Sequence, residues 1–290
     1  MADYSIPKAL DISDISAKNK GYLDQREFEL GNWLISPKYD GCAVRIDIRA
    51  GKVTSMVSAS GKPVRSLGHL IPVLEKALGP TEPNVVLCAE AWTEGRAFQD
   101  ISGMFRRHSE QSDLHLQVFD GYFTTPTLGY KTRMQVLDWY LNRSSVPRVH
   151  VVPLRTATAL SSAWGEAFEL VAAGGCDGAV LHWAGKPFTE GRSKWDCVKL
   201  KPLLTYDVLV TGVQKGVGEA TGRPTAALIC RWVGGSSQEV ATGLTEAQQA
   251  DPEQFVGKII EIAGMGLTTA GKLREPRFIG VREDKLTPEF

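Results

Sequence analysis

The sequence has no long apolar run and no paired cysteines, and each absence excludes a class of protein. No stretch reaches the roughly 18 apolar residues of a membrane-spanning helix. The opening MADYSIPKALDIS carries acidic residues and lacks the apolar segment of a signal peptide. The five cysteines, Cys42, Cys88, Cys176, Cys197 and Cys230, stand far apart without any C-x-x-C pair. This disfavours both a disulfide framework and a structural zinc site, so we expect a soluble intracellular protein.

The sequence also lacks an excess of positive or negative charge, because 33 Lys and Arg residues balance 33 Asp and Glu residues. A polyanion would have to meet a local basic surface, since the protein as a whole carries no field of one sign. Net charge therefore neither indicates nor excludes a nucleic-acid partner.

With 290 residues, 43% of them apolar, the chain is long enough for two domains. In the first part, short runs rich in β-formers predict strands over 32–39, 42–50, 52–59, 84–92, 114–123, 148–154, 177–183 and 195–201. Apolar residues at helical spacing predict helices over 67–79, 130–143 and 161–175. Strands at uneven spacing with a few helices are typical of an α+β fold with antiparallel sheets.

The pattern changes after KLKPLLTYD. Five short strands are predicted over 207–218, 226–234, 238–243, 258–266 and 277–284, with one helix over 245–257. This spacing favours a small Greek-key barrel of the oligonucleotide-binding (OB) type. We place the boundary near 201–205 and predict domains over 1–203 and 204–290, with a hinge around Pro202.

The stretch SPKYDGCAVRIDI, residues 36–48, puts Lys38 two residues before the pair Asp40 and Gly41. By itself Lys-x-Asp-Gly is a weak motif. One interpretation is an Asp-Gly hairpin that joins two strands and leaves Lys38 in solvent. The other is that the Lys38 amine is a nucleophile that attacks phosphorus. That chemistry requires cations for the phosphate oxygens, carboxylates for a metal or a ribose, and an aromatic face for the base.

Further motifs follow in order along the chain. They are SASGK (58–62), CAEAW (88–92), LQVFDGY (116–122), CDGAVLHW (176–183), GRSKWDCVKLKP (191–202) and REPRFIGVREDK (274–285). Together with Lys38-x-Asp40-Gly41 they resemble the six-motif set of covalent nucleotidyltransferases, and most closely the short ATP-dependent DNA ligases of viral and bacterial, phage-like type. The segment AFQDISGMFRR (97–107) is similar to a segment of small phage-type ligases. The resemblance implies an antiparallel-sheet nucleotidyltransferase (ATP-grasp-like) domain followed by a small OB-fold β-barrel.

The resemblance also implies roles for individual residues. Lys38 would be adenylated, and Lys199 and Lys201, alternate residues of one strand, would direct two amines at the α-phosphate. The implied ATP-binding residues are Ser36, Pro37, Arg45, Glu90, Phe119, Arg192, Arg282 and Lys285, with Phe119 stacking on adenine. Glu90 and Asp177 would hold Mg²⁺. Residues Arg282 and Lys285 form a sixth motif that would orient the pyrophosphate leaving group. The residues expected to contact DNA are Lys62, Arg65, Arg106 and Arg107.

Four positions depart from the family pattern. Ala43 and Ala59 stand where an arginine is usual, Asp177 replaces a glutamate, and His182 stands where a lysine is frequent. The cation missing at Ala59 has to come from elsewhere, for example from Lys62 or Arg65.

The resemblance implies an ATP-dependent DNA ligase that uses ATP and Mg²⁺ and seals nicks in double-stranded DNA. It also implies a monomer in the cytoplasm of a bacterial or phage-infected cell, without membrane contact. NAD-dependent ligases are disfavoured because 37 residues precede Lys38 and cysteine pairs are lacking. Three alternatives stay open: an mRNA-capping-type guanylyltransferase, an RNA ligase, and a non-catalytic nucleic-acid-binding module.

Overall fold

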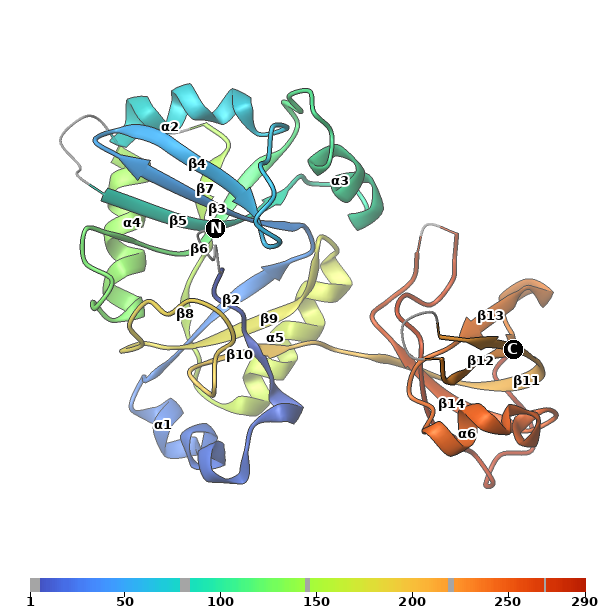
Figure 1. The fold of residues 1–290 in the computed structure, drawn as a ribbon. Coiled ribbons are helices and arrows are strands. Elements are labelled where there is room, and N and C mark those ends of the chain that lie inside the picture. Colours follow the sequence, from blue (N-terminus) through green and yellow to red (C-terminus); the bar gives the residue numbers. More distant parts are fainter. Residues whose placement is uncertain (1–5, 79–83, 144–146, 219–221, 269) are drawn as a thin grey trace. The chain divides into compact units, whose positions relative to one another are not determined.

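The computed structural model describes residues 6–78, 84–143, 147–218, 222–268 and 270–290. The chain divides into two compact units, the first ending at Pro202 and the second running from Leu203 to Phe290 (Figure 1).

The first unit is built on two five-stranded sheets. One sheet has the order β4-β3-β5-β6-β7, with β4 at Lys52–Ser58, β3 at Cys42–Arg49, β5 at Asn84–Trp92, β6 at His115–Phe123 and β7 at Val149–Val151. The other has the order β1-β10-β9-β2-β8, with β1 at Leu10–Asp11, β10 at Cys197–Leu200, β9 at Cys176–Trp183, β2 at Trp33–Tyr39 and β8 at Arg155–Thr156. Neighbouring strands are antiparallel, except in the pairs β6–β7 and β1–β10.

Helices pack on these sheets. They are α1 (Gln25–Glu29), α2 (Ile71–Leu78), α3 (Phe98–Phe105), α4 (Tyr130–Arg143) and α5 (Leu160–Ala173), with short 3₁₀ turns η1 (Ile12–Asp14), η2 (Ala17–Leu23) and η3 (Gly68–Leu70). The largest core lies between the first sheet and α2 and α4, where Leu74 and Leu137 are fully buried (Figure 1). Helix α5 packs on β9, β10 and β2.

Strand alternation separates this core from the functional face of the first sheet. On β3, Val44, Ile46 and Ile48 are fully buried in the helix-covered core. The intervening residues Ala43 and Arg45 therefore point to the opposite face, because successive side chains of a strand alternate. That face is turned toward the second sheet and carries both polar side chains and a small apolar cluster that includes Val86 and Cys88.

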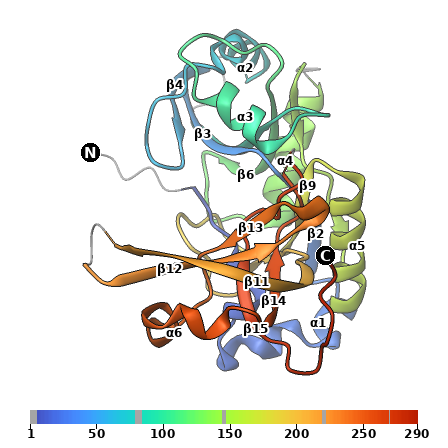
Figure 2. The same ribbon diagram turned by 90° about the vertical axis from the view of Figure 1, so that its right-hand side faces the viewer.

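The second unit is a five-stranded sheet with the order β13-β12-β11-β14-β15. Its elements are β11 (Leu204–Val217), β12 (Pro224–Arg231), η4 (Val233–Gly235), β13 (Ser237–Val240), α6 (Glu246–Ala250), η5 (Pro252–Phe255), β14 (Ile259–Gly264) and β15 (Arg277–Val281). Strand β11 pairs with β14 in its first half and with β12 in its second, across a bulge after Val210. A bridge between Thr242 and Arg277 connects the two sheet edges and closes the barrel. Figure 2 shows the long β11–β12 hairpin.

The expected α+β class and the OB-type barrel are confirmed. The expected helix over 245–257 is divided into α6 and η5, because Asp251 leaves helical geometry before Pro252. Thr245 begins α6 with a capping box to Gln248. The short elements β1, β8, α1 and α3 were not predicted.

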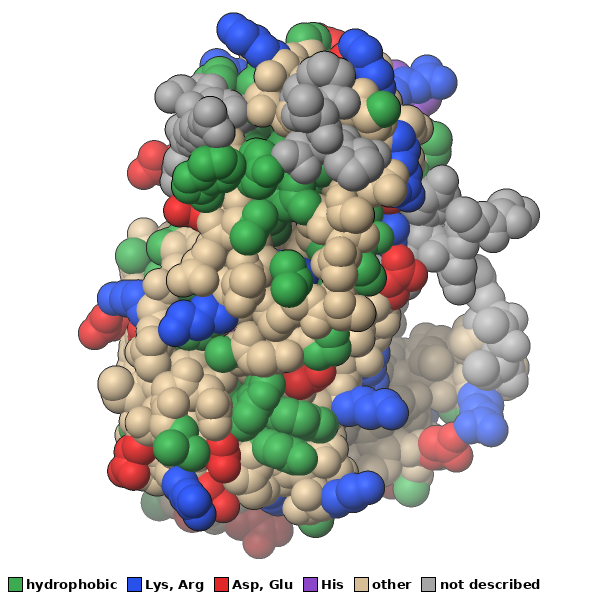
Figure 3. Space-filling model, turned by 90° about the vertical axis from the view of Figure 1, so that its left-hand side faces the viewer, with side chains coloured by type: hydrophobic (Ala, Val, Ile, Leu, Met, Phe, Trp, Pro, Cys, Tyr) green, Lys and Arg blue, Asp and Glu red, His purple; other side chains and the backbone are tan. Residues whose placement is uncertain are grey.

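The alternative of an Asp-Gly hairpin is wrong. Strand β2 pairs with β8 and β9, and β3 pairs with β4 and β5, so Asp40 and Gly41 carry the chain from one sheet to the other. None of the described helices is both long and apolar enough to span a membrane. On the face drawn in Figure 3, basic and acidic side chains are interspersed.

Candidate functional site

Lys38 lies near the end of β2, on the sheet face turned toward β5 and β6. It stands opposite Gly178 of β9, and Ser36 stands opposite Val180, which in turn faces Lys199 of β10. Cross-strand neighbours share a face of a sheet, so Ser36, Lys38 and Lys199 point the same way.

A close approach of two backbones requires the glycine after Lys38-x-Asp40. A Cβ on Gly41 would lie 2.3 Å from the carbonyl oxygen of Ala91 on β5. The φ angle of Gly41 is not in the left-handed region, so the requirement is space and not backbone conformation. This contact brings the end of β2 against β5, and with it Lys38 toward Glu90.

The facing sheet contributes Glu90 from β5 and Gln117, Phe119 and Asp120 from β6. The ladder between β5 and β6 shifts between Cys88 and Ala89, which leaves Phe119 without a paired residue. Such a bulge re-aims side chains. Here it allows the consecutive residues Phe119 and Asp120 both to line the same cavity.

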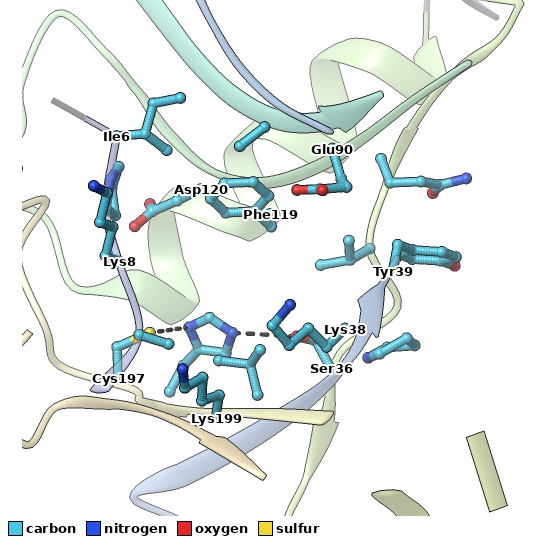
Figure 4. A pocket seen from close by; sticks show the side chains of 18 of the residues that line it. Ile6, Lys8, Ser36, Lys38, Tyr39, Glu90, Phe119, Asp120, Cys197 and Lys199 are labelled. Carbon is cyan, nitrogen blue, oxygen red and sulfur yellow. Dashed lines mark hydrogen bonds between the residues drawn. The ribbon is translucent and has the colours of Figure 1, made fainter. Parts of the chain in front are cut away.

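These side chains surround a cavity of about 340 Å³ between the two sheets (Figure 4). This volume is in the range of small-molecule sites. Of the predicted site residues, it brings together Ser36, Pro37, Lys38, Glu90, Phe119, Lys199 and Lys201. The segment Ile6–Ala9 also lines it, a contribution that sequence reasoning missed. It is held there by hydrogen bonds from Lys8 N to Gly191 O and from Ser193 N to Lys8 O. The local sequence around Lys8 contains no pattern that predicts pairing with a segment so far along the chain.

Two lysines share one carboxylate at the cavity. Lys38 Nζ lies 2.9 Å from Asp177 Oδ1, and Lys201 Nζ lies 2.6 Å from Asp177 Oδ2. Burial opposes the charged form of the Lys38 amine, but the charges of Asp177 and Glu90 outweigh it and raise the pKa of Lys38 above 10.5. Without a ligand, the amine is therefore held protonated and is not yet a nucleophile.

The environment of Glu90 favours its uncharged form, whereas that of Lys38 favours the charged form. Burial raises its pKa to about 8, and the charges of Asp177 and Asp40 add to this effect, although Lys38 acts against it. At neutral pH a protonated Glu90 is able to donate a hydrogen bond, for example to a hydroxyl oxygen of a ribose. A cation in the cavity would shift it to the carboxylate.

Glu90 and Asp177 fit a magnesium ion that arrives with phosphate. No group of three or more metal-ligating side chains occurs among the described residues. Mg²⁺ is usually bound by one or two carboxylates, with water and substrate phosphates completing its shell. Asp177 Oδ1 is buried and makes no hydrogen bond, although the Lys38 amine is near it. The donor set is therefore suited to a shared, substrate-borne metal and not to a closed protein site.

His182 forms part of the cavity floor. Its Nε2 lies 3.1 Å from Ser36 Oγ, and its Nδ1 lies 3.6 Å from Cys197 Sγ (Figure 4). Its ring stacks on that of Tyr130, with the ring centroids 4.1 Å apart. Burial lowers the pKa of His182 well below 6.5, so the ring is neutral. Where the family frequently has a lysine, this chain thus has an uncharged, tightly packed side chain.

The four residues expected to contact DNA gather at a second hollow of about 950 Å³. Lys62 and Arg65 follow β4, and Arg106 and Arg107 follow α3. Ser66 Oγ donates to Phe105 O over 2.8 Å and fastens the two segments together. None of the described residues that line this hollow is acidic. Ala43 and Ala59 line both this hollow and the cavity, so the two adjoin.

Four predicted ATP-binding residues do not line the cavity. Arg45 is buried in ion pairs with Asp47 and Glu190, and Arg192 is exposed in an ion pair with Asp14. Arg282 and Lys285 belong to the second unit, where both contact Asp207.

Comparison with known proteins shows similarity to DNA ligases. Residues 215–282 match the sequence profile of the DNA ligase OB-like domain. A probable DNA ligase of Mycobacterium sp. (strain KMS) is 30% identical over 207 residues, which cover 67% of this chain and 38% of the relative. The chain therefore spans well under half the length of this curated relative.

Solved structures share the fold over almost the whole chain. A Lig E DNA ligase, described as binding DNA with a minimal scaffold, superposes with a TM-score of 0.72 at 17% identity, covering 96% of this chain and all of the other. The ATP-dependent DNA ligase of bacteriophage T7, solved with ATP, gives a TM-score of 0.55 at 15% identity, covering 95% of this chain and 98% of the other.

The fold is thus a ligase-type nucleotidyltransferase domain followed by an OB-like domain. In its fold and its OB-like domain, the chain is similar to ATP-dependent DNA ligases, the family that its sequence motifs resemble.

Proposed function

We propose that this chain is an ATP-dependent DNA ligase that seals nicks in double-stranded DNA through a lysyl-AMP intermediate on Lys38. The observation that carries the proposal is the joint placement of Lys38, Lys199, Lys201, Glu90 and Phe119 around one cavity. A purely binding module has no need for a lysine held protonated between carboxylates in a nucleotide-sized space.

ATP binds with its adenine against Phe119 and with Ser36 and Pro37 beside the base. Glu90 contacts the ribose. The α-phosphate lies at Lys38, where Lys199 and Lys201 neutralise its oxygens. These roles rest on the cavity lining and on the motif positions.

In the first step Lys38 Nζ attacks the α-phosphorus. The ammonium loses one proton, for which the Asp177 carboxylate is the nearest acceptor. The Nζ lone pair then forms the P–N bond, and the bond to the bridging oxygen breaks, so that pyrophosphate leaves with the electron pair. A second proton leaves Nζ as the phosphoramidate forms. An anionic phosphate by itself would favour the ammonium form, so the loss of the proton depends on cations: Lys199, Lys201 and a magnesium ion held by Asp177 and Glu90 would disfavour a charged Lys38.

Mg²⁺ held by Glu90, Asp177 and the phosphates would supply charge neutralisation at the reacting phosphorus. The protein contributes alignment, because each transfer is an in-line displacement that depends on positioning and electrostatics.

Two further transfers complete sealing. A 5′-phosphate oxygen at the nick attacks the lysyl-AMP phosphorus, and the P–N bond breaks as Nζ regains its protons. The adjacent 3′-hydroxyl then attacks the 5′-phosphorus, AMP leaves, and the phosphodiester forms. The basic hollow with Lys62, Arg65, Arg106 and Arg107 binds strand phosphates, independently of base sequence.

We also propose that the protein acts as a monomer in the cytoplasm of a bacterial or phage-infected cell. Light scattering of the purified protein, alone and with nicked DNA, measures the oligomeric state. A mass of twice the 31.6 kDa chain would contradict the monomer.

The test of the proposed function is a sealing assay on a duplex with one nick, labelled at the 5′-phosphate. With ATP and magnesium we expect conversion to the full-length strand by the wild type and by Lys18→Ala, a change at an exposed lysine away from the cavity. We expect none by Lys38→Ala. Sealing by Lys38→Ala at the wild-type rate would refute the proposal, and covalent labelling of the protein by GTP but not by ATP, without sealing, would indicate a guanylyltransferase.

A further inference from the structure

A buried carboxylate in the second unit holds both cations of the sixth motif. Asp207 lies on β11, opposite Glu261 of β14, and is only 5% exposed. Its Oδ1 accepts a hydrogen bond from Arg282 Nη1 at 2.9 Å, and its Oδ2 lies 3.2 Å from Lys285 Nζ. A single aspartate thus contacts two residues that are three positions apart.

The guanidinium of Arg282 is fixed from two sides. Its Nε and Nη2 donate to Asp284 at 2.9 and 2.8 Å, while Nη1 donates to Asp207. The backbone is fixed as well, since Arg282 N donates to Ile259 O and Lys285 N donates to Arg282 O. With both edges of its planar fork engaged, Arg282 retains few rotamers, and its remaining N–H groups point in a defined direction.

Charge attraction alone does not explain this cluster. Arg282 and Lys285 bring two positive charges, and Asp207 and Asp284 cancel them. A general basic patch for a polyanion would not place a buried aspartate beneath its cations, because a buried charge is costly unless it is paired. The contribution of Asp207 is to fix the orientation of the Arg282 and Lys285 side chains.

We propose that Asp207 is a positioning residue that orients Arg282 and Lys285 toward the pyrophosphate portion of ATP during adenylation of Lys38. This inference rests on the proposed ligase function. It restricts the role of Asp207 to the first transfer, since only that step releases pyrophosphate.

The test compares two reactions of the same protein. One is label transfer from ATP to the protein, and the other is sealing of a nicked duplex that already carries AMP on its 5′-phosphate, without ATP. For Asp207→Asn, which keeps the shape but loses the charge, we expect ATP labelling to slow by about tenfold to a hundredfold, as for a misplaced catalytic group. Sealing of the pre-adenylated nick should stay within about twofold of the wild type by the same reasoning.

Two companion variants separate positioning from folding. Asp207→Glu restores the charge and is expected to recover part of the labelling rate. Glu246→Gln removes an acid from an exposed pair with Arg223 on the same barrel and should leave both rates unchanged. Thermal unfolding of each variant establishes that the barrel is intact.

Two outcomes would overturn the positioning role of Asp207. Wild-type labelling by Asp207→Asn would overturn the inference, and so would an equal fall in both reactions, which indicates a merely structural role. If the wild type itself takes no label from ATP, the proposed ligase function fails instead, so the two failures are distinguishable.

Discussion

Substitution of Gly178 by alanine tests whether strand packing sets the geometry around Lys38. Gly178 stands opposite Lys38 on β9. Its φ is +142°, and a Cβ there would lie 2.0 Å from the carbonyl oxygen of Leu200 on β10. Since Cβ atoms essentially never approach within 3.0 Å, β9 and β10 must separate by about 1 Å.

The expected cost combines two effects. Overpacking of this kind costs about 1–3 kcal/mol, and an alanine at this φ adds about 1–3 kcal/mol of backbone strain. We therefore expect Gly178→Ala to lower the free energy of unfolding of the first unit by about 2–6 kcal/mol. The shift also displaces Lys199 and Lys201, and an error of 1 Å in such groups costs about a hundredfold in rate.

Denaturant unfolding followed by tryptophan fluorescence measures the stability, because six of the seven tryptophans lie in the first unit. The matched control is Gly165→Ala in α5, where nothing lies within 4 Å of the added Cβ. That variant should be more stable by about 0.5–1 kcal/mol, the usual gain for alanine over glycine within a helix. If Gly178→Ala unfolded within about 0.5 kcal/mol of the wild type, a size typical of neutral surface changes, the close-approach argument would be refuted.

Three further predictions concern charge. Asp177→Asn removes a carboxylate that raises the pKa of Lys38, so an amine-reactive ester at pH 8 should modify Lys38 faster in the variant; equal rates by peptide mass spectrometry would contradict this. The pKa of Glu90 is raised from 4.5 to about 8, so its contribution to stability is present below about pH 4.5 and is lost as the pH rises toward 8. Glu90→Gln should therefore gain stability relative to the wild type across this range, and a pH-independent difference in denaturant midpoints would oppose the assignment. Arg106→Ala should reduce the slope of log Kd against log salt for nicked DNA by about 1, whereas Arg49→Ala, away from the hollow, should not, and equal slopes for the two variants would argue against the hollow as the phosphate site.

The alternation of residues along a strand predicted part of the site from the sequence. Lys199 and Lys201 were expected on one face of a strand, and both line the cavity. The change of sequence pattern after residue 201 predicted a separate small barrel, and the chain divides into two compact units after Pro202. These features depend on local periodicity, which a sequence displays directly.

Other features depend on contacts between distant segments and could not be predicted. The bulge that aims Phe119 into the cavity arises from pairing with β5. Arg45, expected to bind ATP, instead lies in a buried ion-pair cluster with Asp47 and Glu190. The contact between Asp207 and Arg282 joins residues that are 75 positions apart. Nothing in the local sequence specifies such partners.

The most direct test of the account is to detect and locate the covalent adduct. The purified protein is incubated with magnesium and ATP labelled at the α-phosphate, separated under denaturing conditions, and digested for mass spectrometry. We predict one AMP on Lys38, no adduct in Lys38→Ala, and loss of the label when nicked DNA is added. An adduct on another residue, or no adduct from ATP, would contradict the central claim.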